Sequence, residues 1–511
     1  MSLRVFLRLL AITAFALSSS CIHKAGVAPW PEDTWPTATP ESQGLDSTAL
    51  ADAVRLIRSE NINIHSIFLV RNGYSVLDVV FYPYDGKRLH DVASVTKSVT
   101  ATLVGQAVAE GTLPDLDTPV LRLLDKRPPE RSLQDWDGIT LEKLVTMSSG
   151  LECGAPPVEE KVIVLRNSPN WVDAALTMPL TVKPGTLFDY CSPNFHLLSS
   201  AMSHATGLSL AAYARDRLFS PLGIKKYYWP ADPQGISVGW GDLRLHPHDM
   251  ARIGYLHLRK GRWKDRQILP EGWVKEATTA RYSTHGGQAD YGYGWWLAKG
   301  RFAGVYEARG RGGQGISVWP RADIVLVTTG GGYDRDRVVE ALVPAVQSSR
   351  ALPENPQGIK KLAKAVAEAA GAPVPGPVRA VPETAARISG KPFIMEENLL
   401  GLESFSMKFA EGASQARLAA TISGREYRYA VGLDGVYRFS ETSPSGDPAA
   451  LRGHWEAPER FALDYNEVTR INRFRMDFTF TDDEVNLVFE EPTGQIRGEI
   501  KGKRGIPKGL L

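Results

Sequence analysis

A serine and a lysine stand three residues apart at the start of a predicted helix, in "HDVASVTKSVTATLVGQAVAEG" (90–111). On a helix, Ser94 and Lys97 would lie on one face, within reach of each other. A serine hydroxyl is a weak nucleophile near neutral pH and needs a base close by. A desolvated lysine loses part of its preference for the charged form and can accept the serine proton. The pair therefore predicts acyl-enzyme chemistry, although a capping serine and a solvated lysine would give the same spacing.

The elements around this helix indicate an α+β fold. Another helix is expected over 46–60, and two β-rich runs flank Asn72-Gly73, a strong hairpin signal. The region 113–273 reads as loops and helices. Strands return in "YGYGWWLA", "GISVWP" and "DIVLVTTG", before a helix over 335–346. Strands at both ends with helices between them favour one antiparallel sheet flanked by helices, with an inserted helical lobe.

The C-terminal part has a different composition. "IKKLAKAVAEAAG" predicts a short helix and "APVPGPVRAVPE" a semi-rigid proline-rich linker, together within 351–383. From Thr384 onward, period-two runs such as "SFSMKFA", "REYRYAVGL" and "FRMDFTF" dominate. Residues 384–511 are therefore expected to form a small all-β C-terminal domain, either a barrel or a sandwich.

Residues 1–21 have the features of a signal peptide. Arg4 and Arg8 accompany an apolar run that is too short to span a bilayer, and small residues precede Cys21. The end "ALSSSC" is similar to a bacterial lipoprotein acceptor, although Ser18 stands where leucine is usual. We expect an exported protein, periplasmic or associated with the outer membrane, with the membrane reached only through a lipid on Cys21. Ordinary signal cleavage nearby is the alternative.

The composition excludes some partners. Lys+Arg 59 against Asp+Glu 57 gives a net charge of +2 without a long run of one sign, which argues against nucleic acid. His246 and His248 lie only two residues apart, and neither HExxH nor a paired CxxC is present. We therefore expect neither a metal nor another cofactor, and a small molecule as the partner. The oligomeric state does not follow from the sequence.

Five segments, in order along the chain, resemble the serine β-lactamase and penicillin-binding-protein superfamily, in particular its class C-like branch of β-lactamases, esterases and D-peptidases. "ASVTKSVTATLVGQAVAEGTLPDLDTPV" is similar to the nucleophile helix, and "ITLEKLVTMSSGL" to the next segment. "PGTLFDYCSPNFHLLS" occupies the place of the Tyr-x-Asn element, and "GRGGQGISVWP" that of the Lys-Thr-Gly strand; "GDLRLHPHDMARIG" lies between them. The resemblance runs from Ala38 to Val346, so we expect the hydrolase domain over 38–350.

The resemblance implies roles for individual residues. Ser94 would be the acylated nucleophile and Lys97 its partner. Tyr190 would relay protons from Ser94 to the leaving group and later activate the deacylating water. A phenol titrates near 10, but nearby cations would make its anion accessible. The backbone N–H groups of Ser94 and Gln314 would form the oxyanion hole.

Two of the family's elements are altered in this sequence. Ser192 stands where the family usually has asparagine, and a hydroxyl offers fewer hydrogen-bonding groups to a substrate amide. Arg311-Gly312-Gly313 replaces Lys-Thr-Gly. Arginine can hold a carboxylate through two hydrogen bonds but cannot shuttle a proton, and a solvated loop cation is the alternative for Arg311. Gly312 removes a hydroxyl, and Gly313 lets substrate lie against the strand edge.

Two further cysteines flank the expected cleft. In an extended Tyr190-Cys191-Ser192, the outer side chains face one way and Cys191 the other. Cys191 could then bond to Cys153 behind the site and join two catalytic loops. Two buried, reduced thiols are the alternative.

Two hypotheses on function follow. The first is a serine hydrolase that cleaves an ester, a small amide or a D-peptide through an acyl-enzyme on Ser94, including substrates of the aminohexanoate-oligomer type. The second is an acylatable penicillin-recognising binding or sensor protein with slow deacylation, or a weak β-lactamase. The altered recognition groups argue against an efficient β-lactamase.

Overall fold

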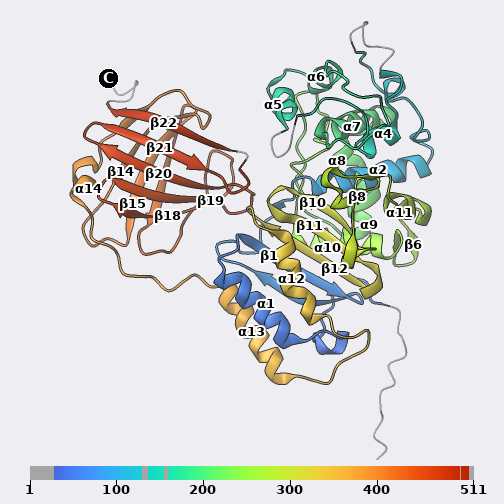
Figure 1. Ribbon diagram of the computed structural model, residues 1–511, viewed down its shortest axis with the longest axis horizontal. Helices are drawn as coiled ribbons and strands as arrows, with labels where there is room; N and C mark the ends of the chain where they lie inside the picture. The colour runs from blue at the N-terminus through green and yellow to red at the C-terminus, as the bar shows by residue number, and fades with distance from the viewer. Residues whose placement is uncertain (1–27, 129–135, 155–158, 495, 506–511) are drawn as a thin grey trace, which may run out of the picture.

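The protein is described by a computed structural model over residues 28–128, 136–154, 159–494 and 496–505 (Figure 1). The expected signal peptide, with Cys21, lies outside the described residues.

An antiparallel eight-stranded sheet is built from both ends of the first 350 residues, as predicted. The N-terminal hairpin pairs through its first strand with the last strand of the region, in the register Phe68↔Val327. In spatial order the strands are β2 (Tyr74–Val80), β1 (Ile64–Arg71), β12 (Ile324–Gly330), β11 (Gln314–Trp319), β10 (Tyr306–Gly310), β9 (Trp296–Ala298), β8 (Ala289–Tyr291) and β7 (Tyr282–Ser283).

Helices cover both faces of this sheet, which is why β1 is buried along its whole length. Ile67 and Leu69 pack against α1 (Ser47–Ser59), α12 (Arg335–Leu342) and α13 (Pro356–Ala370). Phe68 and Val70 face the opposite core, which contains α2 (Val95–Ala109) and α10 (Pro247–Leu258). The alternation of the two sets follows from the period of two in a strand.

A helical lobe is inserted between the two halves of the sheet and sits above α2 in Figure 1. Its helices are α4 (Leu141–Val145), α5 (Glu160–Asn167), α6 (Trp171–Leu176), α7 (Ser192–Thr206), α8 (Leu210–Ala214) and α9 (Ser220–Leu222). The remaining elements of this domain are α11 (Glu271–Ala277), β3 (His90–Asp91), β4 (Arg244–Leu245), β5 (Arg262–Trp263) and β6 (Arg266–Gln267). Among the described helices, none combines the length and the apolar character that crossing a membrane requires.

Two elements differ from the sequence-based expectation. "YGYGWWLA" is not one strand, because a turn between Tyr291 and Trp296 separates β8 from β9. Gly294 in this turn has a φ of 76°, and its carbonyl accepts a hydrogen bond from Ser98 of α2. The helix expected over 335–346 ends at Leu342 and continues as a single 3-10 turn, since Pro344 cannot donate to a longer helix.

The C-terminal domain is a ten-stranded all-β barrel, so the choice between barrel and sandwich is resolved. The sheet closes through a pairing of Gly432 with Arg452, and aromatic side chains fill its core. A short helix, α14 (Glu383–Ile388), precedes it. In spatial order the strands are β16 (Arg425–Gly432), β15 (Gln415–Ile422), β14 (Leu402–Lys408), β13 (Phe393–Met395), β22 (Arg497–Arg504), β21 (Glu484–Glu490), β20 (Arg473–Thr481), β19 (Arg460–Glu467), β18 (Ala449–Ala457) and β17 (Arg438–Ser440).

The barrel is attached to the first domain close to the predicted nucleophile. The backbone N–H of Asp91 donates to the carbonyl of Thr469, 2.9 Å away, in the loop between β19 and β20. Asp447 of the barrel pairs with Arg244, next to β3, and both side chains are largely buried. The loop that connects β19 to β20 is therefore fixed beside the start of α2.

Helix α2 depends on a glycine at its contact with α11. A Cβ on Gly105 would lie 2.3 Å from the ring of Trp273. Alanine normally favours a helix over glycine by about 1 kcal/mol. We nevertheless expect Gly105→Ala to lower the free energy of unfolding by about 1–3 kcal/mol, because the ring is displaced. Urea denaturation measures the difference. In the control Gly272→Ala, on α11, the added Cβ meets nothing within 4 Å, so stability should be unchanged or higher. Equal effects of the two substitutions would contradict the packing argument.

Candidate active site

Ser94 is placed by a constrained loop that follows β3. Asp91 Oδ1 accepts a hydrogen bond of 2.8 Å from the backbone N–H of Ala93, whose φ of 47° is unusual for a residue with a side chain. Such left-handed residues are held by their surroundings and cluster at functional sites. Ser94 follows as the N-cap of α2, half-buried at the positive end of the helix dipole.

Lys97 is completely buried one turn along the same helix. Its Nζ lies 3.0 Å from Ser94 Oγ and 3.1 Å from the carbonyl oxygen of Trp240. Only 1% of the side chain surface remains exposed. Burial lowers the pKa of Lys97 to about 8, while the negative charges of Glu159 and Asp242 partly oppose this shift. The amine can therefore lose its proton near neutral pH and accept the one on Ser94.

Tyr190 lies across Lys97, and its ring centroid is 4.7 Å from Nζ. We expected nearby cations to make the phenolate accessible, and that expectation is wrong. Burial, followed by the charges of Glu159 and Tyr291, raises the pKa of Tyr190 well above its ordinary value, although the contact with Ser94 lowers it. Tyr190 is therefore a neutral phenol in the resting protein.

A disulfide and a methionine hold the Tyr190 loop. Cys191 is bonded to Cys153, with 5.2 Å between their Cα atoms, and both are buried behind the site. The Cys191 N–H donates to Met147 Sδ at 3.3 Å, and the carbonyl of Met147 accepts from the N–H of Asp189 at 2.8 Å. The phenol is thereby held between two cross-linked segments.

Ser192 contacts a carboxylate that the sequence analysis did not identify. Glu159 Oε2 accepts from the Ser192 N–H at 2.7 Å, and Oε1 accepts from the Ser192 hydroxyl at 2.8 Å. Asn194, two residues further on, does not replace the missing family asparagine. It is fully buried and accepts a hydrogen bond from Ser149. Nothing in its local sequence singled out Glu159.

Arg311 lines the cleft, but its guanidinium is directed to the barrel. It donates to Thr493 Oγ1 at 3.0 Å and to Asn472 Oδ1 at 3.2 Å, and it lies 3.4 Å from Glu491. Gly312 is needed here, because a Cβ would lie 2.4 Å from Ile471 of the barrel. The replacement of Lys-Thr-Gly thus coincides with a contact between the two domains, which the sequence did not reveal.

Gly313 and Gln314 complete the hairpin end beside the nucleophile. A Cβ on Gly313 would clash with Tyr333, whose hydroxyl donates to the Gly313 carbonyl at 2.7 Å. Gln314 is fully buried and pairs with Gly310, which packs against Val92 and Ala93. This register brings the Gln314 backbone to the end of the sheet nearest Ser94, where an oxyanion hole is expected.

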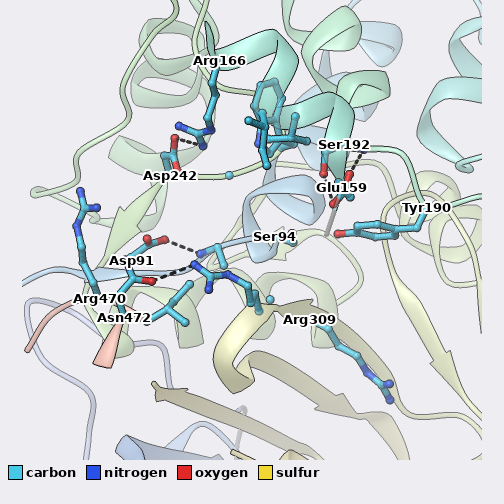
Figure 2. Close-up of a pocket in the computed structure, with 18 of the residues that line it drawn as sticks. Asp91, Ser94, Glu159, Arg166, Tyr190, Ser192, Asp242, Arg309, Arg470 and Asn472 are labelled. Atoms are coloured by element: carbon cyan, nitrogen blue, oxygen red, sulfur yellow. Dashed lines mark hydrogen bonds and ion pairs between the residues drawn. The ribbon is translucent and has the colours of Figure 1, made fainter. Parts of the chain in front are cut away.

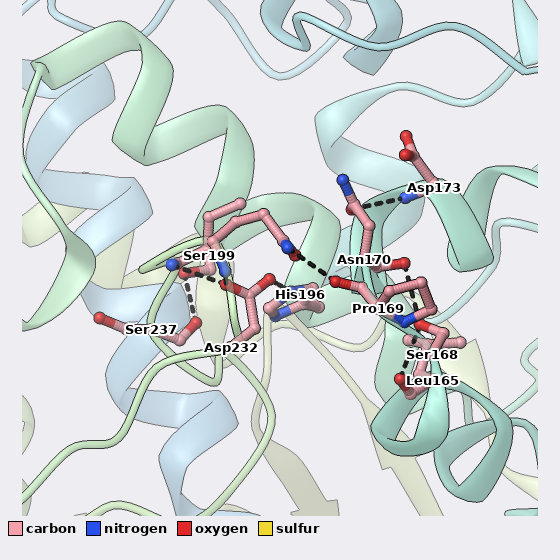
Figure 3. Close-up of polar contacts among 11 residues, drawn as sticks. Leu165, Ser168, Pro169, Asn170, Asp173, His196, Ser199, Asp232 and Ser237 are labelled. Carbon is pink, nitrogen blue, oxygen red and sulfur yellow. Dashed lines mark hydrogen bonds and ion pairs between the residues drawn. The ribbon is translucent and has the colours of Figure 1, made fainter.

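A buried histidine and aspartate support the wall that carries Trp240. His196 of α7 and Asp232 form a contact of 2.9 Å between Nε2 and Oδ2 (Figure 3). Burial lowers the pKa of His196, so the ring is neutral and donates Nε2–H to the carboxylate. The ring also packs against Trp171 and Trp240 at 5.4 and 5.2 Å. These contacts fix the segment whose carbonyl holds Lys97.

These side chains line a cleft of about 610 Å³. Ser94, Tyr190, Ser192, Glu159 and Arg311 all contribute to its wall. The barrel contributes four further residues: Arg470, Ile471, Asn472 and Ile496. These four could not be predicted from the sequence, because they come from a domain whose position relative to the first could not be inferred. Of the described residues, no group of three or more His, Cys, Asp or Glu is arranged to hold a metal.

The disulfide should stabilise the whole domain. It closes a loop with a sequence separation of 38 residues, for which chain entropy predicts about 4 kcal/mol. We expect the double variant Cys153→Ala/Cys191→Ala to lose up to that amount of unfolding free energy in urea. Wild-type protein treated with dithiothreitol should lose a similar amount. Free thiols in unreduced wild-type protein, seen by mass spectrometry, would contradict the assignment.

The sequence was compared with known families and proteins. The family model described as beta-lactamase matches residues 58–343. The 6-aminohexanoate-dimer hydrolase of Paenarthrobacter ureafaciens is 26% identical over 295 residues, 53% of this chain and 73% of that protein. The D-aminopeptidase of Gluconobacter oxydans (strain 621H) is 26% identical over 181 residues, 34% of this chain and only 32% of that protein. A solved family VIII carboxylesterase superposes with a TM-score of 0.49 at 17% identity, over 61% of this chain and 98% of that chain.

The matched family region extends over more than half of the 511 residues and contains Ser94, Lys97, Tyr190 and Gln314. The chain therefore belongs to the beta-lactamase family of serine hydrolases and is an enzyme of that family.

Proposed function

We propose that the protein hydrolyses esters or small amides through an acyl-enzyme on Ser94. The observation that carries this proposal is the 3.0 Å contact between Lys97 Nζ and Ser94 Oγ, in a site where burial lowers the pKa of the amine to about 8. The cleft, of about 610 Å³, has room for a small ester or amide.

In the acylation step, neutral Lys97 accepts the hydroxyl proton of Ser94 while Oγ forms a bond to the substrate carbonyl carbon. The carbonyl of Trp240 accepts an N–H of the amine, which directs the nitrogen lone pair toward Ser94. The backbone N–H groups of Ser94 and Gln314 stabilise the oxyanion; losing one such donor typically lowers the rate by about 10²–10³. The proton then passes to the leaving group as its bond to the acyl carbon breaks.

Tyr190 acts in this scheme as a neutral relay. Because its pKa is raised, the phenol does not lose its proton in advance. It accepts a proton from the Lys97 amine while it donates its own proton to the leaving group. In deacylation, water attacks the carbonyl carbon of the acyl-enzyme ester while Lys97 and Tyr190 remove the proton of the water. The bond between the acyl carbon and Ser94 Oγ then breaks, and Oγ takes up the proton.

The relatives support small amides among the substrates. The two reported above are named 6-aminohexanoate-dimer hydrolase and D-aminopeptidase. Ser192 and Arg311 retain little of the recognition set that the family resemblance implies for β-lactams, since one holds Glu159 and the other contacts the barrel. An ester or a small amide or D-peptide is therefore the favoured class.

A second candidate is an acylatable binding or sensor protein. The raised pKa of Tyr190 favours it, because deacylation then lacks a phenolate base. A fluorescent penicillin distinguishes the two: a sensor retains one covalently bound equivalent, because the leaving amine of the opened ring stays attached to the acyl group, whereas a hydrolase releases the hydrolysed penicillin and continues.

Export remains a prediction from the first 21 residues. The disulfide between Cys153 and Cys191 supports it, because structural disulfides persist in oxidising compartments such as the periplasm.

Removal of the nucleophile should abolish turnover. We expect Ser94→Ala to lower kcat/KM for p-nitrophenyl acetate or butyrate by at least about a thousandfold, because Ser94 is the one hydroxyl among the described residues that hydrogen-bonds to Lys97 Nζ. Absorbance of released p-nitrophenol measures the rate. Ser203→Ala is the matched control, since the buried Ser203 hydroxyl has no hydrogen-bond partner. Undiminished hydrolysis by the Ser94 variant would remove it from the mechanism.

The pH dependence of kcat/KM should follow the titration of the Lys97 amine. With a pKa of about 8, the neutral amine rises from roughly a tenth of the population at pH 7 to nine tenths at pH 9. We expect kcat/KM for p-nitrophenyl acetate to increase about tenfold over this interval and then level off. In Lys97→Arg this limb should disappear along with most of the activity, since arginine stays charged. A limb near pH 6 in the wild-type enzyme would assign the base to another group.

A further inference from the structure

Glu159 adds a carboxylate to the cleft beside the reacting groups (Figure 2). It is half-buried immediately before α5, and each of its oxygens accepts one hydrogen bond from Ser192. A carboxylate offers about four acceptor positions. About half of this capacity remains for a ligand.

The arginines that line the cleft are already paired with carboxylates. Arg166 contacts Asp242 at 2.7 Å, Arg311 lies beside Glu491, and Arg470 pairs with Asp447 of the barrel. Asp91, like Glu159, has no ion pair among the described residues, but its Oδ1 is engaged by the Ala93 N–H. Over the part of the chain that the structure describes, Glu159 has no cationic side chain within 4.0 Å. In the half-buried site its direct contacts are therefore the two hydrogen bonds from Ser192. A ligand with a positive group would be attracted there, and an anionic one repelled.

The charge also acts on the reacting groups. Glu159 is the first of two carboxylates, with Asp242, that raise the pKa of Lys97, and it contributes to the raised pKa of Tyr190. An ammonium group bound to Glu159 would cancel this effect and favour the neutral, reactive amine of Lys97.

We propose that the cleft selects substrates whose acyl part carries a free ammonium group, that Glu159 binds this group, and that Ser192 is a positioning residue that orients the carboxylate. This inference rests on the proposed acyl-enzyme function of Ser94. The substrate class is aminoacyl amides and esters, with the ammonium a few bonds from the carbonyl under attack. A shorter side chain in place of the family asparagine is then part of the specificity, because Ser192 contacts Glu159 through both its N–H and its hydroxyl.

The test compares substrates that differ only in the amino group. Purified full-length protein is assayed with the p-nitroanilides of D-alanine, L-alanine and propionic acid, and with p-nitrophenyl propionate as a reactive neutral ester. Glu159→Gln removes the charge and keeps the shape, and Glu159→Asp keeps the charge. Glu160→Gln is the matched control, on the exposed neighbouring residue.

We expect the wild-type enzyme to prefer an alanine anilide to the propionyl anilide by at least tenfold in kcat/KM. Glu159→Gln should remove most of this preference, with a far larger loss on the amino substrates than on the neutral ester, and Glu159→Asp should restore part of it. Glu160→Gln should behave as wild type. Turnover of the neutral ester also shows that each variant is folded.

A pH profile with the neutral ester adds an independent measurement. In Glu159→Gln the rising limb assigned to Lys97 should move to lower pH, because one of the two charges that raise its pKa is gone and only that of Asp242 remains. The limb of Glu160→Gln should not move.

Equal losses on amino and neutral substrates in Glu159→Gln would overturn the inference, since the residue would then serve the chemistry or the fold. Active wild-type enzyme without a preference for the amino substrates would overturn it as well, and would leave the acyl-enzyme proposal standing. Activity that survives in Ser94→Ala would instead refute the proposed function.

Discussion

The site depends on the burial of one amine. Lys97 is buried, and among the described residues its Nζ hydrogen-bonds to the Ser94 hydroxyl and the Trp240 carbonyl alone. In the unfolded chain the same amine is solvated and titrates near 10.5. A folded pKa of about 8 lies below that value, so at pH 7 the charged amine destabilises the folded state, by about 3 kcal/mol. The same desolvation makes the amine a usable base near neutral pH.

Much of the surrounding fold serves to keep this amine dry and oriented. Helix α2 lies between the sheet and the helical lobe, so its polar side chains must find partners inside the protein. Ser98 donates to Gly294, and Thr100 donates to the carbonyl of Gly239, next to Trp240. The neutral His196, held by Asp232, packs against Trp240 from the other side. Rigid partners of this kind preserve a catalytic geometry that would relax if the surroundings were mobile.

The sequence predicted the parts of the structure that depend on local pattern. The Asn72-Gly73 hairpin, the sheet built from distant strands and the Ser94 helix follow from periodicity, turn chemistry and the resemblance to a known family. Contacts between residues far apart in the chain could not be predicted. Glu159 meets Ser192 across 33 positions and Arg311 meets Thr493 across 182. The pKa of Tyr190 was misjudged for the same reason, since burial and Glu159, rather than cations, dominate its surroundings.

The substitution at position 192 is explained by the residue that Ser192 contacts. Serine in place of asparagine removes the carboxamide at position 192, and Ser192 instead holds a carboxylate. By itself this charge makes Lys97 harder to deprotonate, which opposes acylation at neutral pH. A carboxylate in this position is therefore a disadvantage for neutral substrates and an advantage for cationic ones, because a bound ammonium both binds to it and relieves the unfavourable charge. The electrostatics of the cleft thus link substrate recognition to activation of the base.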